Sequence, residues 1–283
     1  MYNIVEIITY KKKGLKFIKG DTRKEAIKNI ISNTLHFVLI LSLMLLIVVL
    51  VKTDLGERMH LGVLNHIIES NLKKYDLSDN KEFNYIYYSK DVISSEKENI
   101  ENSLSEISYL TDEMVANNLK IIITKNSVRD VVEIIGDNLI RSSHNEDDDT
   151  IGSYFPQLNL MVITLYNLDN LYSLLNVDGE IDYTIEELLY IADEFNIGTL
   201  MHEIGHFLDD ISESSLHYNE DFKASYSEEK DFIFNEEENY YKSTISEYIA
   251  ECLASILSDN LEDSTLNNTK TYDILYSFLD KFK

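Results

Sequence analysis

The sequence predicts an α+β protein: a small N-terminal sheet packed with helices, then a mainly helical half, all preceded by one transmembrane helix. Three observations predict this arrangement. Leu35 to Val51 is apolar except for His36 and Ser42, short β-branched runs follow in the middle of the chain, and the pattern beyond Thr184 is almost wholly helical. The 283 residues are enough for one or two domains with a sizeable core.

The charge balance and the cysteine count exclude several classes of protein. Asp and Glu number 50 against 25 Lys and Arg, which gives a formal net charge of −25. Nucleic-acid binding is not expected, because it needs clustered Lys and Arg to neutralise phosphates. The single cysteine, Cys252, excludes an intramolecular disulfide and a cysteine-based zinc cluster.

The N-terminal part of the chain predicts a membrane anchor. Residues 34–51 are just long enough to cross a hydrocarbon core and are expected to form a transmembrane helix that acts as a signal anchor; a buried globular helix is the alternative. The basic segment 1–33 would stay in the cytoplasm by the positive-inside rule. Residues 52–98 would form a stalk or linker to an extracellular domain at 99–283. We therefore expect a single-pass protein of the cell membrane, or a secreted protein if the chain is cleaved after the hydrophobic segment.

Local patterns place the first elements of the domain. Ser95 and Glu98 form a capping box ahead of an amphipathic helix. Leu119 to Thr124 is a short apolar run with β-branched residues, which is typical of a strand.

The later elements follow in the same way. Ile151 to Phe155 and Leu158 to Tyr166 have strand character and predict a hairpin. Thr184 with Glu187 forms a second capping box, and helices are expected from there to Phe282.

The segment from His202 to His206, which reads HEIGH, is the sharpest feature of the chain. On a helix, positions i and i+4 lie on one face, so both imidazoles can bind one Zn²⁺. Glu203 lies beside them, where it can take a proton from zinc-activated water. The alternative is two histidines packed in a helix that is polar at this point. Gly205 needs a reason, because a glycine in mid-helix costs about 1 kcal/mol relative to alanine; close approach of another backbone would explain it.

Two histidines leave a zinc ion short of protein ligands. A histidine six residues after His206 would complete the metzincin pattern, but Ser212 occupies that position. Glu247 and Glu251 lie four residues apart, on one face of a predicted downstream helix. One of them can ligate the zinc while the other orients a ligand histidine through its second ring nitrogen.

These two segments resemble a known family. Residues His202 to Asp210, HEIGHFLDD, resemble the corresponding helix of anthrax lethal factor. Residues Glu247 to Glu251, EYIAE, are similar to a segment of that family which is also found in the secreted Pro-Pro endopeptidases. The resemblance extends over about residues 100–283 and implies a zincin metallopeptidase domain.

The resemblance also implies roles for individual residues. In the family, the first glutamate of the second segment is the third zinc ligand, and a tyrosine seven residues earlier lies over the metal. Here these positions are Glu247 and Tyr240. One Zn²⁺ per chain would thus be held by Glu247 and the two histidines, with Glu203 as general base. Tyr240 would donate a hydrogen bond to the oxyanion; Tyr241 is the adjacent competitor.

Two further residues are candidates for a supporting role, behind the zinc ligands. These are Glu251 and Asp209, although a solvated charge at the helix end is an equal alternative for Asp209. The strand Leu158 to Leu165 is expected to lie beside the cleft, where a peptide could add to the sheet.

The implied function is a zinc-dependent endopeptidase that hydrolyses peptide or protein substrates outside the cytoplasm. One alternative is a non-catalytic, surface-anchored binding protein on a degenerate protease fold. A toxin-type protease released from the membrane is another. The residues that would shape the substrate cleft do not define a substrate.

Overall fold

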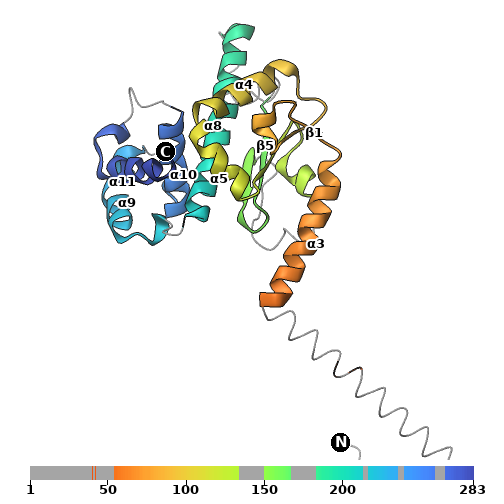
Figure 1. Cartoon of the computed structure of the whole chain (residues 1–283). Coiled ribbons are helices and arrows are strands. Elements are labelled where there is room, and N and C mark those ends of the chain that lie inside the picture. Colours follow the sequence, from red (N-terminus) through yellow and green to blue (C-terminus); the bar gives the residue numbers. More distant parts are fainter. Residues whose placement is uncertain are drawn as a thin grey trace, which may run out of the picture. The chain divides into compact units, whose positions relative to one another are not determined.

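The structure is a computed structural model that describes residues 54–133, 150–166, 183–212, 216–234, 239–258 and 265–283, together with Ile40 and Ser42. The chain divides into two compact units, Met1–Gly62 and Val63–Lys283. The second unit contains the sheet and all the candidate site residues, and the description below concerns this unit (Figure 1).

The structure corrects the predicted fold class and the predicted membrane location. The described chain is mostly helical with a small mixed sheet. In the part that the structure describes, no helix combines the length and the apolar character needed to span a bilayer. The predicted transmembrane helix at residues 34–51 lies outside the described residues except for Ile40 and Ser42. A single-pass membrane protein, and a membrane contact through 34–51, are therefore not supported. Spanning a hydrocarbon core takes a continuous apolar helix of about 20 residues, and the described helices do not meet this requirement.

The sheet has five strands in the order β1-β2-β3-β5-β4. The strands β2, β3 and β5 are parallel, and β1 and β4 pair antiparallel to them at the two edges. The strand bounds are β1 Asp76–Leu77, β2 Ile86–Tyr88, β3 Lys120–Thr124, β4 Gly152–Phe155 and β5 Leu160–Thr164. Residues 52–98, expected to be a stalk or linker, thus contain two strands of the sheet.

The expected hairpin is formed by β4 and β5, with Phe155 opposite Leu160. Its connection is a 3₁₀ turn, Pro156–Leu158, followed by Asn159 at a φ of 44°, which asparagine tolerates better than most residues. Because β5 pairs with β3 on its other side, β4 and not β5 lies at this edge of the sheet. The expectation that Leu158 to Leu165 forms the strand beside the cleft is therefore wrong.

The helices α3, α4 and α5 precede the hairpin, and α4 begins differently from the prediction. The helix α4 begins at Ser94, and the Glu96 carboxylate accepts a hydrogen bond from the backbone N–H of Ile93 at 2.9 Å. The capping box predicted at Ser95 and Glu98 is thus shifted by two residues. The bounds are α3 Asp54–Leu72, α4 Ser94–Glu106 and α5 Thr111–Ala116, with 3₁₀ turns at Lys81–Phe83 and Ser108–Leu110.

Beyond Thr184, the secondary-structure elements that the structure describes are all helices. The capping box at Thr184 and Glu187 is present: Thr184 N–H donates to Glu187 Oε2 at 2.7 Å, and Glu187 N–H donates to Thr184 Oγ1 at 3.2 Å. It opens α8, the longest of the described helices. The bounds are α8 Ile185–Ile211, α9 Glu220–Ile233, α10 Ile245–Leu257 and α11 Lys270–Leu279, with 3₁₀ turns at Leu216–Tyr218, Thr265–Asn268 and Asp280–Phe282.

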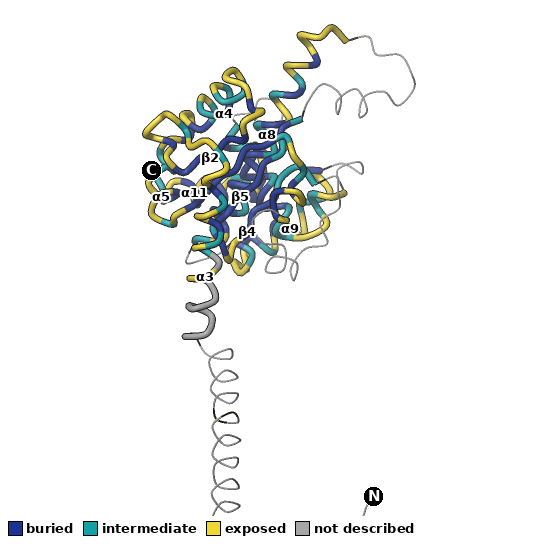
Figure 2. The backbone as a smooth tube through the Cα atoms, turned by 90° about the vertical axis from the view of Figure 1, so that its right-hand side faces the viewer, coloured by how far each residue is buried: buried dark blue, intermediate teal, exposed yellow. Residues whose placement is uncertain are grey.

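The helix α8 lies between the sheet and the group α9, α10 and α11 (Figure 1). Its C-terminal half is buried on both sides, as the dark blue part of the tube shows (Figure 2). The first turns of α8 instead expose large apolar side chains, Leu189 and Tyr190 among them. The buried half of α8 carries the HEIGH segment, so these residues lie in the interior of the second unit.

Candidate functional site

The helices α8 and α10 touch through their backbones. A Cβ atom added to Gly205 would lie 2.7 Å from the carbonyl oxygen of Ala250 and 2.8 Å from its Cα. Only glycine allows this approach, which confirms the expectation that another backbone packs against α8 at this point. The contact brings the polar face of α10 over the two histidines of α8.

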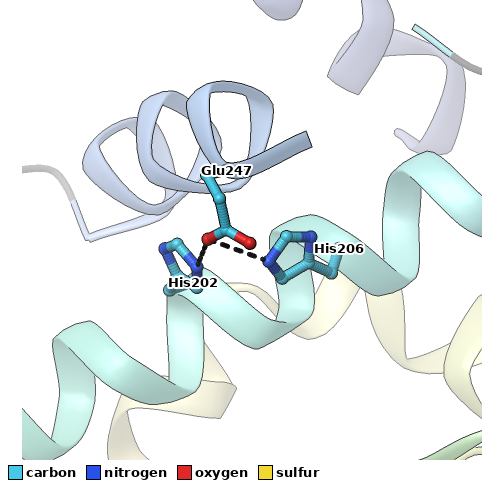
Figure 3. A group of neighbouring side chains, drawn as sticks. All are labelled: His202, His206 and Glu247. Carbon is cyan, nitrogen blue, oxygen red and sulfur yellow. Dashed lines mark hydrogen bonds and ion pairs between the residues drawn. The ribbon is translucent and has the colours of Figure 1, made fainter. Parts of the chain in front are cut away.

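The side chains of His202, His206 and Glu247 converge across this helix pair (Figure 3). Glu247 Oε2 lies 3.1 Å from His202 Nε2 and 3.6 Å from His206 Nε2. One nitrogen or oxygen atom from each residue lies within 4.8 Å of the others, so the group could hold a metal ion. Two imidazoles and one carboxylate are a donor set typical of catalytic zinc sites, which keep one position open.

The second ring nitrogen of each histidine also has a partner. His202 Nδ1 lies 2.9 Å from Glu251 Oε2, and His206 Nδ1 lies 3.3 Å from the Ser246 hydroxyl. A carboxylate at Nδ1 favours the tautomer that leaves the Nε2 lone pair free for a metal. Ser246 was missed in the sequence; its place directly before Glu247, on the first turn of the same helix, was the available signal.

The pKa values in this group are shifted by the carboxylates that lie close together in it. Burial would lower the pKa of His202, but hydrogen bonds to Glu247 and Glu251 and the nearby Glu203 raise it to about 10. Burial likewise opposes ionisation of Glu247, yet its contacts with both histidines hold the pKa of this carboxyl well below its ordinary value. The site therefore attracts positive charge, and a divalent cation satisfies the same requirement.

Glu203 is buried beside the histidines, with only 6% of its surface exposed. Burial raises the pKa of its carboxyl group, which the neighbouring histidines partly oppose. The backbone N–H of Tyr154, in β4, donates a hydrogen bond to this carboxylate. The side chain thus reaches from α8 to the edge of the sheet.

Asp209 binds residues that follow α8. Its carboxylate accepts hydrogen bonds from the backbone N–H of Leu216 at 2.6 Å and from His217 Nδ1 at 2.8 Å. It is buried, so the alternative of a solvated charge is wrong. Both contacts hold the residues that follow α8 against the C-terminal end of that helix.

Tyr240 and Tyr241 occupy distinct positions. The Tyr240 hydroxyl donates a hydrogen bond to Glu247, and burial together with the Glu247 charge raises the pKa of this phenol. The Tyr241 ring instead packs against His202 and Phe234, with ring centroids 5.9 and 5.7 Å away. The Tyr240 hydroxyl thus reaches a member of the converging group.

A cavity of about 790 Å³ opens beside this group. His202 and Glu203 form part of its wall, with Gly152 at the start of β4. Aromatic side chains from the first half of α8, Tyr190 and Phe195, extend the wall away from the histidines. The candidate metal group therefore lies at one side of a cleft bounded by an edge strand and by α8.

The sequence matches no protein-family model and no curated protein. Among solved structures, that of the Pro-Pro endopeptidase from Paenibacillus alvei is similar to this one, with 15% sequence identity and a TM-score of 0.41. The similarity covers 70% of this chain and 97% of that chain. The resemblance of the two sequence segments to anthrax lethal factor stays a prediction.

Proposed function

We propose that this protein is a zinc-dependent endopeptidase whose metal ligands are His202, His206 and Glu247. The observation that supports the proposal is the convergence of these three donor atoms within 4.8 Å, next to a buried carboxylate and at the wall of a cavity. A bound Zn²⁺ would supply Lewis acidity and would bring the pKa of a coordinated water to about 7.

Glu203 is the general base in this proposal. It follows His202 directly, and its burial makes the carboxyl group a better proton acceptor than an exposed glutamate. It accepts the proton of the attacking water and later passes it to the leaving amine. The Tyr154 N–H occupies one side of this carboxylate, so the attacking water approaches it from another side.

Tyr240 is the proposed donor to the oxyanion of the tetrahedral intermediate. Its hydroxyl already reaches Glu247, so a small rotation of the side chain brings it to a substrate oxygen beside that ligand. Glu251 and Ser246 orient the two ligand histidines through their Nδ1 atoms.

A peptide in extended conformation is the proposed substrate. The strand β4 lies at an edge of the sheet, where an extended peptide can add as a further strand. The cleft beside it has aromatic walls that suit peptide side chains. The edge strand and the candidate metal group share this cleft.

The test is cleavage of a diverse peptide library by the full-length, zinc-loaded protein, with cut sites read by mass spectrometry. We expect about one zinc per chain and cleavage that stops when a chelator is added. Glu203→Gln should bind zinc and lose about 10²- to 10⁴-fold in kcat/KM. Glu186→Gln, at an exposed position of the same helix, is the matched control and should keep full activity. Zinc binding without any cleavage would instead favour the non-catalytic binding protein.

A further inference from the structure

The proposed general base lies against a strand residue that has no side chain. A Cβ atom added to Gly152 would lie 2.8 Å from Glu203 Oε1 and 3.0 Å from Glu203 Cγ. It would also lie 2.6 Å from Thr199 Cγ2, one helical turn before Glu203. Carbon atoms do not approach at these separations, so any side chain at position 152 must displace one of its neighbours.

The neighbouring part of β4 is fixed to α8 and cannot easily move aside. Side chains two residues apart on a strand point to the same face, so Tyr154 faces α8 as Gly152 does. The Tyr154 hydroxyl donates to Asp210 at 2.9 Å, and its ring packs edge-on against Phe207 at 5.8 Å between centroids. The residue that must yield to a side chain at position 152 is therefore Glu203 or Thr199.

We propose that Gly152 is a positioning residue for the general base, which keeps the Glu203 carboxylate on the Tyr154 N–H and directed at the metal ligands. The inference rests on the proposed function. Displacing a reacting group by about 1 Å can cost about 10²-fold in rate, so the space left by one missing methyl group is sufficient to matter. The competing account is that Gly152 only permits the strand and the helix to pack.

The first experiment compares Gly152→Ala with Gly62→Ala in the full-length, zinc-loaded protein. Gly62 has no neighbour within 4 Å of an added Cβ and lies outside the second unit, so it is the matched control. In Gly152→Ala we expect kcat to fall about 10- to 100-fold, while KM stays within about threefold and zinc stoichiometry is unchanged. An unchanged kcat would overturn the inference.

The second experiment separates the two neighbours. Thr199→Ser removes the methyl group that an added Cβ would strike, and serine can keep the 2.9 Å hydrogen bond to the Phe195 carbonyl. The double variant Gly152→Ala, Thr199→Ser should remain impaired relative to Thr199→Ser alone, because the contacts with Glu203 persist. Full recovery of kcat in the double variant would assign the defect to helix–strand packing and would overturn the inference.

The third experiment does not depend on activity. Amide hydrogen exchange of Tyr154, measured in the metal-free protein, reports whether its N–H is bound to the Glu203 carboxylate. We expect exchange about tenfold faster in Gly152→Ala than in the wild type and in Gly62→Ala. Equal rates would show that Glu203 has not moved and would contradict the inference. A wild-type protein that cleaves no peptide would refute only the proposed endopeptidase function, since exchange still decides where Glu203 lies.

Discussion

Gly205 and Ala250 lie backbone to backbone, with the Ala250 carbonyl oxygen 2.7 Å from where a Cβ of residue 205 would be. Each stands among the residues of the candidate site, Gly205 between the two histidines of α8 and Ala250 between the two glutamates of α10. This one close contact therefore sets the distance between the two histidines of α8 and the two glutamates of α10. The geometry of the group that could hold a metal ion therefore depends on a residue with no side-chain donor atom.

Alanine at position 205 should destabilise the fold and loosen the metal site. Its methyl group would meet backbone atoms of α10, which cannot rotate away, so we expect a loss of about 1–3 kcal/mol in the free energy of unfolding and weaker zinc binding. Urea denaturation and zinc titration measure the two effects. Gly198→Ala, in the same helix but with nothing within 4 Å, should instead gain up to about 1 kcal/mol. Equal stability of the two variants would contradict the packing argument.

The roles of the two glutamates of α10 can be ranked by zinc affinity. Glu247 contacts both histidines at the Nε2 atoms, whereas Glu251 contacts His202 at Nδ1. Replacing Glu251 by alanine should weaken zinc binding about 10- to 100-fold, and replacing Glu247 should weaken it further. Competition with a chromophoric chelator gives both affinities. If the Glu251 variant bound zinc more weakly than the Glu247 variant, Glu251 would be the zinc ligand and Glu247 the residue that orients a histidine.

The two adjacent tyrosines should differ in their effect on the rate. Tyr240→Phe removes the hydroxyl that reaches Glu247, and we expect kcat to fall about 10²-fold with zinc binding retained. Tyr241→Phe preserves the ring that packs on His202, so its effect should be much smaller. Steady-state kinetics on one cleaved peptide measure kcat for both variants. A larger loss of kcat in Tyr241→Phe would assign the oxyanion contact to Tyr241.

Glu229 should make stability depend on pH. Its carboxylate accepts hydrogen bonds from Lys270 N–H and Thr271 N–H, both at 2.9 Å, and so caps the start of α11. Burial would raise the pKa of this carboxyl, but these hydrogen bonds lower it below its usual value of 4.5. A lowered pKa means that the stabilisation is present above about pH 4.5 and is lost as the pH falls through the lower, folded-state value.

The measurement compares Glu229→Gln with Glu228→Gln, an exposed neighbour in the same helix. At pH 7, Glu229→Gln should lower the free energy of unfolding by about 1 kcal/mol, since a charged acceptor is replaced by a neutral one and the site is partly open to solvent. The difference should shrink in urea denaturation experiments below pH 4. A constant difference would mean that the charge of Glu229 is not what stabilises α11.

The elements that depend on short-range periodicity could be predicted. Thr184 and Glu187 cap a helix because the partners are three residues apart, and the two histidines share a face because they are four apart. The reason for Gly205 could also be stated in advance, because the cost of glycine in mid-helix is a local property. The capping box at Ser95 failed because neighbouring polar residues, Ser94 and Glu96 among them, offered an alternative start two positions away.

Residue order along the chain predicted which groups meet at the candidate site: two imidazoles, a neighbouring carboxylate and a second acidic segment. It could not tell that β4 rather than β5 lies at an edge of the sheet, that Ser246 supports His206, that Asp209 binds the chain after α8, or that Gly152 meets Glu203. It also led from one apolar run to a membrane helix that the structure does not support. Helix and strand periods repeat within a few residues, so the local sequence predicts them. Strand order and the contacts between distant segments instead depend on how all the apolar faces are buried together.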